Sequence, residues 1–389
     1  MKSEQRSDSV ALQAPQASLH VIELDPQTDP RWETLMKDLP ASVVYQHPAW
    51  LRVLEETYGY KPLHLACEDS SGQLRGVLPL FSRRGLRTGR VGESVFDSPV
   101  AGPLAVDDQA SALLIQAAIA QTRNERGRQF QMKVLSTRFD QLVGPVNGVP
   151  LFETYELALP EQPDHLHLDS RIKWAVNKAT RLGMHVRPAE TERELRLWYD
   201  LYLQTMRHLV AVPKPYRFFQ IAWRHLQPRG LLRLLLAEQV EAGKSRIVSG
   251  FLFLQWGDTI SHIFTGWRRE DQGLRPNDLL HWYAIRESCT LGLRNYDFGN
   301  VRVGDQGLIQ FKSKWGAQAK IIYRYTYPAV PYDALIALAP HPTPASLPAQ
   351  AARPSKSTII RQRISPFWQR LPLKAIEWVG NGSHILHYY

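Results

Sequence analysis

Cysteine is scarce in this chain of 389 residues, which contains only Cys67 and Cys289. A secreted protein held together by disulfides needs more cysteines, and a structural zinc site commonly uses cysteines in closely spaced pairs. The two cysteines are far apart in the sequence and form no such pair. We therefore expect a cytosolic protein with reduced, structural cysteines and no metal site.

Long apolar runs are also absent. The nearest approach, residues 247–256, has the length of a strand and falls well short of the ~18 residues that a membrane-spanning helix needs. Residues 1–18 are polar and lack the apolar stretch and cleavage site of a signal peptide, so we expect them to be disordered. These absences favour a cytoplasmic protein that is free to contact the inner face of the cell membrane peripherally.

Familiar catalytic motifs are missing as well. The sequence has no phosphate-binding P-loop, no Gly-x-Ser-x-Gly nucleophile turn and no His-Glu-x-x-His zinc helix.

Acidic residues are too few to balance the basic ones, and the formal net charge is +10. Half of this excess lies in residues 353–389, where six Lys and Arg face Glu377 alone. The charge favours an anionic partner, which is a nucleic acid, a phosphorylated substrate or a lipid headgroup.

A repeated strand pair points to two tandem domains. Residues 63–68 and 76–80 form one predicted hairpin, and residues 234–238 and 250–254 form a similar one 171 to 174 positions later. Duplication of a unit of about 170 residues explains both the repeat and a length that exceeds one ordinary core. We therefore predict domains at 19–160 and 161–330, followed at 331–389 by a linker and a basic amphipathic tail.

The hydrophobic pattern between these hairpins predicts helices and short strands in both halves. Each half therefore mixes largely antiparallel strands with flanking helices, which is an α+β architecture. The predicted helices are 48–58, 110–128, 168–183, 192–209, 216–226 and 277–291, and the further predicted strands are 20–24, 131–135, 184–187, 262–267, 295–299 and 320–327.

The strongest candidate for chemistry is the block of residues 276–316. Asp297 ends a predicted strand, where a carboxylate can line a cleft or only cap a turn. Lys312 follows a glycine-containing loop, where its charge can stabilise an oxyanion or hold a phosphate, or can simply be solvated. Asn277 has the alternative role of a helix cap, and Trp282, Ile285 and Cys289 have the spacing of core residues.

This block resembles the closing segment of the FemAB-like aminoacyl and acyl transferases, a branch of the GNAT acyltransferase superfamily. The resemblance rests on Asn277, Leu279, Leu280 and Trp282, then Tyr-Asp-Phe-Gly at 296–299, and finally Gly307, Leu308, Phe311, Lys312, Trp315 and Gly316. It implies two tandem GNAT-like domains and acyl transfer without a covalent intermediate. It also implies Lys312 and Asp297 as catalytic groups, with Phe311, Asn277 and Trp315 in contact with substrate.

The resemblance extends to the substrates. The basic helix at 171–178 is similar to the family's, which implies that Lys173 and Lys178 bind phosphate on a donor or acceptor; a solvated basic face is the alternative. The implied donor is acyl-CoA or aminoacyl-tRNA, with no tightly bound cofactor. The arginine-rich loop at 83–90 lacks the usual coenzyme A pattern, and the coiled-coil arm that some members use for tRNA is absent.

The implied acceptor is a cell-envelope precursor, such as a lipid-linked glycan or a peptidoglycan precursor. Residues 367–373 are similar to the subgroup that accompanies PEP-CTERM sorting systems, which implies an exopolysaccharide component. Two interpretations without catalysis remain at this point: a nucleic-acid-binding protein that uses its basic surface, and a peripheral protein whose tail lies on an anionic membrane.

Overall fold

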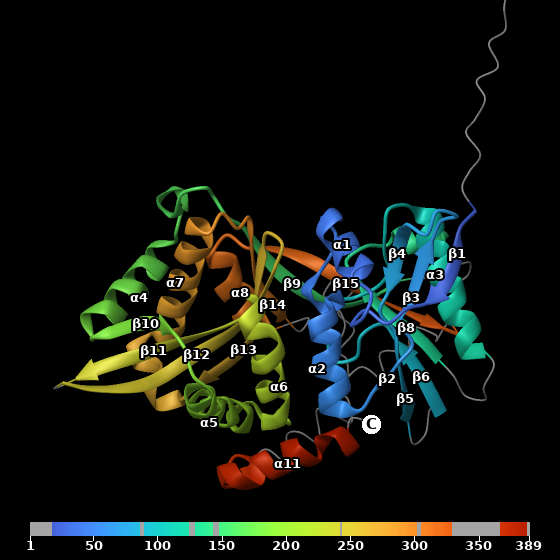
Figure 1. Ribbon diagram of the computed structural model, residues 1–389. Helices are drawn as coiled ribbons and strands as arrows, with labels where there is room; N and C mark the ends of the chain where they lie inside the picture. Colours follow the sequence, from blue (N-terminus) through green and yellow to red (C-terminus); the bar gives the residue numbers. More distant parts are fainter. Residues whose placement is uncertain are drawn as a thin grey trace, which may run out of the picture.

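The computed structural model describes residues 18–85, 89–123, 129–142, 148–241, 243–301, 305–328 and 366–386 (Figure 1). The elements of the first half are β1 (His20–Glu23), α1 (Arg31–Asp38), the 3₁₀ turn η1 (Val44–Gln46), α2 (Pro48–Tyr58), β2 (Lys61–Pro62), β3 (Leu65–Glu68), β4 (Leu74–Leu78), β5 (Phe81–Gly85), β6 (Gly89–Glu93), β7 (Leu104–Ala105), α3 (Asp108–Arg123), β8 (Gln129–Val134) and β9 (Val149–Ala158).

The second half repeats much of this order. Its elements are α4 (Ser170–Arg181), β10 (Met184–Pro188), α5 (Glu192–Leu209), α6 (Tyr216–Leu226), β11 (Leu232–Glu241), β12 (Lys244–Trp256), β13 (Thr259–Trp267), η5 (Arg269–Leu274), α7 (Pro276–Thr290), β14 (Asn295–Val301), α8 (Gln306–Lys314) and β15 (Gln318–Tyr327). A last helix, α11 (Leu373–Leu386), follows after residues that lie outside the described part.

Matching elements confirm the tandem α+β fold. Helix α2 begins at 48 and α6 at 216, while α3 begins at 108 and α7 at 276, so both pairs are 168 positions apart. The predicted hairpins are present, because β3 pairs with β4 and β11 with β12, both antiparallel. Each half also holds one parallel pair, β6 with β8 and β13 with β14.

The two halves exchange their last strands. The large sheet has eleven strands in the order β10-β11-β12-β13-β14-β9-β15-β8-β6-β5-β2, and β1-β3-β4-β7 form a smaller sheet. Strand β9 of the first half pairs with β14, whereas β15 of the second half pairs with β8 and with β9. Figure 1 shows β9 and β15 crossing between the halves. The predicted domain boundaries at 160 and 330 stay predictions, because the sheet is continuous.

Helices cover both faces of the sheet in the second half. Trp198 of α5 packs against Gly250 of β12 and donates its indole N–H to the Gly250 carbonyl at 2.9 Å. The next residue, Phe251, points to the other face and contacts His281 of α7. Since neighbouring strand residues face opposite ways, α5 and α7 lie on opposite sides of β12, as Figure 1 shows.

Local sequence signals explain several helix ends. The predicted helices 48–58, 192–209 and 216–226 have the bounds of α2, α5 and α6. Helix α2 has Pro48 in its first turn and ends at Gly59, whose φ of 68° is the left-handed cap that glycine favours. Helix α5 begins with a capping box between Thr191 and Glu194. The suggested cap of α7 was wrong: Arg275, at φ 60°, occupies the N-cap position, and Asn277 lies inside the helix.

The C-terminal helix α11 packs on the second half. Ile376 is completely buried in the core that α5 and α6 share with the first half. Arg196 of α5 donates to both carboxylate oxygens of Glu377, at 2.6 and 3.1 Å. Part of the predicted basic tail is therefore a docked helix, while residues 1–17 and 329–365 lie outside the described part of the chain.

Candidate acyl-transfer site

The site forms where two parallel strands separate. Strands β13 and β14 pair from Thr259 with Asn295 to Ser261 with Asp297, and beyond this point β14 continues beside β9. The register of β14 shifts between Asp297 and Asn300. Gly299 lies in this irregular segment at φ 76°, and a Cβ atom there would come within 2.7 Å of the His262 carbonyl. Only glycine fits this close approach of the two backbones.

Lys312 is bound at this point of strand separation. It lies on α8, whose N-terminus is capped by the Asp305 side chain, and only 6% of the residue is exposed. Its Nζ donates to the carbonyl oxygens of Gly299 at 2.7 Å and Asn300 at 3.4 Å. Burial lowers the pKa of Lys312 to about 8. Lys312 is therefore not a solvated surface lysine, and it remains largely cationic at neutral pH.

Asp297 lies beside this lysine. Its Oδ1 accepts hydrogen bonds from the Thr154 hydroxyl at 2.6 Å and from the Gly299 amide at 2.8 Å. Asp297 does cap a local turn, but desolvation raises the pKa of its carboxyl group, even though part of the residue remains accessible to solvent. Lys312 partly opposes this rise without forming a direct ion pair within 4.0 Å among the described residues.

Two histidines complete the cluster, His281 buried and His262 partly buried, and sequence reasoning missed both. His262 hydrogen-bonds Thr265 at 2.9 Å, and burial lowers its pKa to about 3. The ring centroid of His281 is 5.2 Å from that of His262, and its Nδ1 lies 2.8 Å from the Tyr296 hydroxyl. Burial lowers the pKa of His281 as well, so both imidazoles are neutral at physiological pH. An isolated histidine in an apolar stretch gives no signal in one sequence.

The first half also lines the site. Thr154 and Tyr155 come from β9, and the ring of Tyr155 lies 5.8 Å from the Nζ of Lys312. Tyr45 of η1 is buried, and Asp297 adds to the effect of burial in raising the pKa of its hydroxyl. The exchanged strand thus brings groups from both halves to the same cluster.

Three predicted substrate-binding residues occupy different environments. The ring of Phe311 is partly buried and lies 5.5 Å from His281. Trp315 is fully buried in the core, and its indole N–H has no hydrogen-bond partner among the residues that the structure describes. The Asn277 side chain accepts a hydrogen bond from Ser249 at 3.0 Å. All three lie on α7, on α8 or directly after α8, close to the cluster in sequence, and their contact with substrate stays a prediction.

Lys173 and Lys178 lie apart from this cluster, on the outer face of α4. Lys173 is exposed, and the Nζ of Lys178 lies 5.3 Å from the ring of Trp174. Arg275, directly before α7, lies 5.5 Å from the same ring. Trp174 is 49% exposed, and both cations lie over its ring. This arrangement can hold phosphates beside the ring.

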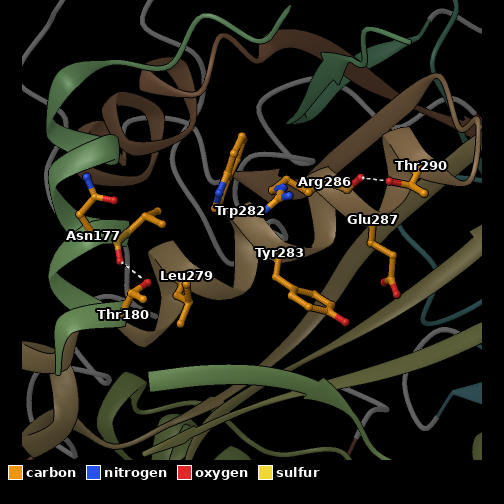
Figure 2. Close-up of a pocket in the computed structure, with 9 residues that line it drawn as sticks. Asn177, Thr180, Leu279, Trp282, Tyr283, Arg286, Glu287 and Thr290 are labelled. Carbon is orange, nitrogen blue, oxygen red and sulfur yellow. Dashed lines mark hydrogen bonds between the residues drawn. The ribbon is translucent and has the colours of Figure 1, made fainter. Parts of the chain in front are cut away.

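A separate pocket of about 510 Å³ lies between α4 and α7. Figure 2 shows Trp282, Tyr283, Arg286 and Glu287 on α7, with Asn177 and Thr180 on the neighbouring α4. Its lining includes none of the residues of the Lys312–Asp297 cluster. Glu287 is paired with Arg233 at 2.7 Å, and Trp282 lies under Arg286 at 5.9 Å. Trp282 is thus partly buried against the core and also lines the pocket, whereas Ile285 and Cys289 are buried.

Comparisons with known proteins agree with this geometry. Residues 168–313, which include Asp297 and Lys312, match the family model described as acetyltransferase (GNAT) domain. The second half therefore carries a GNAT-type acyltransferase domain. No curated protein matches the sequence.

Solved structures show the same fold at low sequence identity. FemX has a TM-score of 0.64 and 14% identity, over 82% of this chain and 99% of FemX. L-PGS from Bacillus licheniformis has a TM-score of 0.54 and 12% identity, over 82% and 97%. A tandem GNAT protein from the clavulanic acid biosynthesis pathway has a TM-score of 0.50 and 12% identity, over 79% and 98%. The chain thus has a tandem GNAT fold.

The described residues add two negative findings. No helix among them is long and apolar enough to cross a membrane. No group of three or more His, Cys, Asp or Glu side chains in the described ranges is arranged to hold a metal ion.

Proposed function

We propose that this protein transfers an acyl or aminoacyl group to an amine or hydroxyl of a cell-envelope precursor, at the Lys312–Asp297 cluster. The supporting observation is the burial of a cationic lysine at the point where β13 and β14 separate. This charge lies within the segment that matches the GNAT domain model. A buried charge in a shaped site is costly, so its presence here supports a functional role.

The cluster offers the groups that acyl transfer requires. An amine or hydroxyl attacks the carbonyl carbon of an ester or thioester, a new C–N or C–O bond forms, and the bond to the leaving oxygen or sulfur breaks. Asp297, with its raised pKa, accepts the proton that the nucleophile loses, and this proton passes to the leaving group. The Lys312 ammonium stabilises the oxyanion that develops on the carbonyl.

The donor is acyl-CoA or aminoacyl-tRNA, and both end in an adenine nucleotide with phosphates. Lys178 and Arg275, which lie over the ring of Trp174, suit the phosphates of such a donor, because both cations can bind phosphate. Lys173 extends the positive charge along the exposed side of α4. No covalently bound or tightly held cofactor is required.

The acceptor is a lipid-linked glycan or another component of peptidoglycan or exopolysaccharide, reached at the inner face of the membrane. FemX and a lysylphosphatidylglycerol synthetase domain from Agrobacterium fabrum share the fold, which is compatible with envelope substrates. The likeness of residues 367–373 to the PEP-CTERM-associated subgroup favours an exopolysaccharide component. Peripheral contact of the basic tail with the membrane would bring the enzyme to such an acceptor.

Mass spectrometry of envelope glycans in a deletion strain tests this function. Complementation with the wild-type gene should restore an acyl or aminoacyl mass increment that Lys312→Met does not restore. Lys133→Met is the control, since Lys133 is also largely shielded, with 13% of its side chain exposed, and donates to a backbone carbonyl, that of Ser98, at 2.7 Å, although it also pairs with Glu93 at 3.0 Å. Equal melting temperatures with activity lost only at Lys312 support the proposal. Full restoration by Lys312→Met would refute it.

A further inference from the structure

Exposed aromatic residues gather at α11 and the turn before it. Phe367 is 67% exposed and Trp378 is 77% exposed, the two largest values among the exposed large hydrophobic residues of the described chain. Isolated apolar residues on a surface are ordinary, but two such rings on one short segment mark a surface that contacts another phase or molecule.

The orientation of these rings is fixed by the inner face of α11. Ile376 is buried, and Gly380 lies so close to Pro213 that an added Cβ would come within 2.8 Å of the proline ring. Lys374 and Trp378 are four residues apart and therefore share the opposite, outward face of the helix. The helix is a docked platform rather than a free tail, so its outer face has one orientation relative to the sheet.

This outer face carries charge of one sign. Arg370 and Lys374 are exposed, and the one acidic residue in 366–386, Glu377, is neutralised by its two hydrogen bonds with Arg196. No carboxylate of this segment is left to repel an anionic surface. Cations beside aromatic rings are the residues that amphipathic helices present to lipid headgroups.

Neighbouring apolar residues extend the surface. Leu209 ends α5 and Val212 follows it, and both are exposed. Their segment borders α11 closely, because Arg207 donates to the Leu371 carbonyl at 3.3 Å and Gln369 donates to the His208 carbonyl at 3.2 Å. Figure 1 shows α11 along the outer side of α5, remote from α4 and α7.

We infer that the outer face of α11 binds an anionic lipid bilayer, with Phe367 and Trp378 in the headgroup region and Arg370 and Lys374 against lipid phosphates. This inference deepens the proposed function by naming the surface that meets the membrane. It also orients the enzyme: α5 and α11 face the bilayer, while α4 and α7, with the Trp174 surface, face the cytoplasm from which a soluble donor arrives.

Vesicle co-sedimentation of the full chain tests the inference. The probes are vesicles of phosphatidylcholine with about one third phosphatidylglycerol, and vesicles of phosphatidylcholine alone. We expect binding to the anionic vesicles only, and a decrease of at least about tenfold in Lys374→Glu, because charge reversal removes one favourable contact and adds a repulsive one. Lys244→Glu changes the net charge equally at an exposed site elsewhere and should bind like wild type.

A second pair of variants separates insertion from charge. Phe367→Ala combined with Trp378→Ala should also lose binding, whereas Leu291→Ala combined with Ile321→Ala removes exposed apolar residues elsewhere and should not. Equal binding by all four variants would overturn the inference, as would a surface that binds a protein partner in pull-downs but no vesicles. Vesicle binding needs no acyl donor, so a failure to bind vesicles would not contradict the proposed acyl transfer. A protein that binds vesicles but shows no acyl transfer would refute only the proposed activity.

Discussion

The Lys312 ammonium group donates a hydrogen bond to the Gly299 carbonyl at 2.7 Å, which ties α8 to the irregular segment of β14. The same backbone segment contributes the Gly299 amide to Asp297. One glycine thus accepts from the cation and donates to the carboxylate, and it positions the two charges relative to each other. This shared contact is the basis for the predictions about the site.

The charge of Lys312 predicts the alkaline limit of activity. With a pKa of about 8, the ammonium loses its proton as the pH rises through that value, and the stabilisation of an oxyanion is lost with it. The acyl-transfer rate should therefore fall above pH 8. In Lys312→Arg the guanidinium stays protonated, so any remaining activity should lack this decline. A wild-type rate that stays level to pH 10 would contradict a catalytic role for the cation.

The same pKa makes a prediction about stability. The folded pKa of about 8 lies below the ordinary lysine value of 10.5, so between these values the unfolded chain holds a proton that the folded chain has released. Raising the pH from 8 to 10.5 should stabilise the wild type relative to Lys312→Met by up to about 3 kcal/mol. Urea unfolding of both proteins across this range measures the difference, and parallel stability curves would contradict the burial of the charge.

Thr154 should tune the acidic limit of activity. Its hydroxyl lowers the pKa of Asp297, so Thr154→Val should raise that pKa and move the acidic limb of the pH–rate profile to higher pH. Thr290→Val removes a hydroxyl that only bonds its own helix, at the Arg286 carbonyl, and should leave the limb unchanged. If Thr154→Val lowers the melting temperature but does not shift the acidic limb of the pH–rate profile, Asp297 has only a structural role.

Gly299 should tolerate no side chain. Gly299→Ala requires a left-handed backbone and also forces Cβ to within 2.7 Å of the His262 carbonyl, so we expect a loss of about 2–4 kcal/mol. Gly292→Ala has a similar φ of 73° but nothing within 4 Å, and should cost only about 1 kcal/mol. Denaturant unfolding measures the loss of stability in each variant. Equal losses would contradict a tight contact between Gly299 and the His262 carbonyl.

Gly380 should control the docking of α11. Gly380→Ala places a methyl group against Pro213, while Gly382→Ala meets no atom within 4 Å and gains helix propensity of about 1 kcal/mol. Amide hydrogen exchange in α11 should therefore accelerate in the first variant and slow in the second. Slower exchange in both would mean that the contact with Pro213 adapts without cost.

The sequence predicts the elements that local chemistry determines. The capping box at Thr191 and Glu194 and the left-handed Gly59 mark helix ends that need no tertiary contact to be recognised. Helix α8 was missed because it is short, contains Gly307 and follows residues rich in glycine. Its Asp305 cap was the one available signal.

Long-range contacts account for most of the features that the sequence does not predict. The block at 276–316 marked Asp297 and Lys312, and the structure brings them to one cluster. Nothing local shows that Thr154 reaches Asp297 across 143 positions, or that His262 and His281 meet. The docking of α11 depends on Ile376 filling a space among α5 and α6, which a single sequence does not reveal.

The exchange of β9 and β15 has a consequence for how this molecule can be divided. A fragment that stops near Ala158 would expose an unpaired β9, and one that starts near Ser170 would leave β14 without β9 and Asp297 without Thr154. Neither fragment should be active alone. When the two fragments are co-expressed, they should associate through these unpaired strand edges, because each fragment carries a strand that pairs with the other.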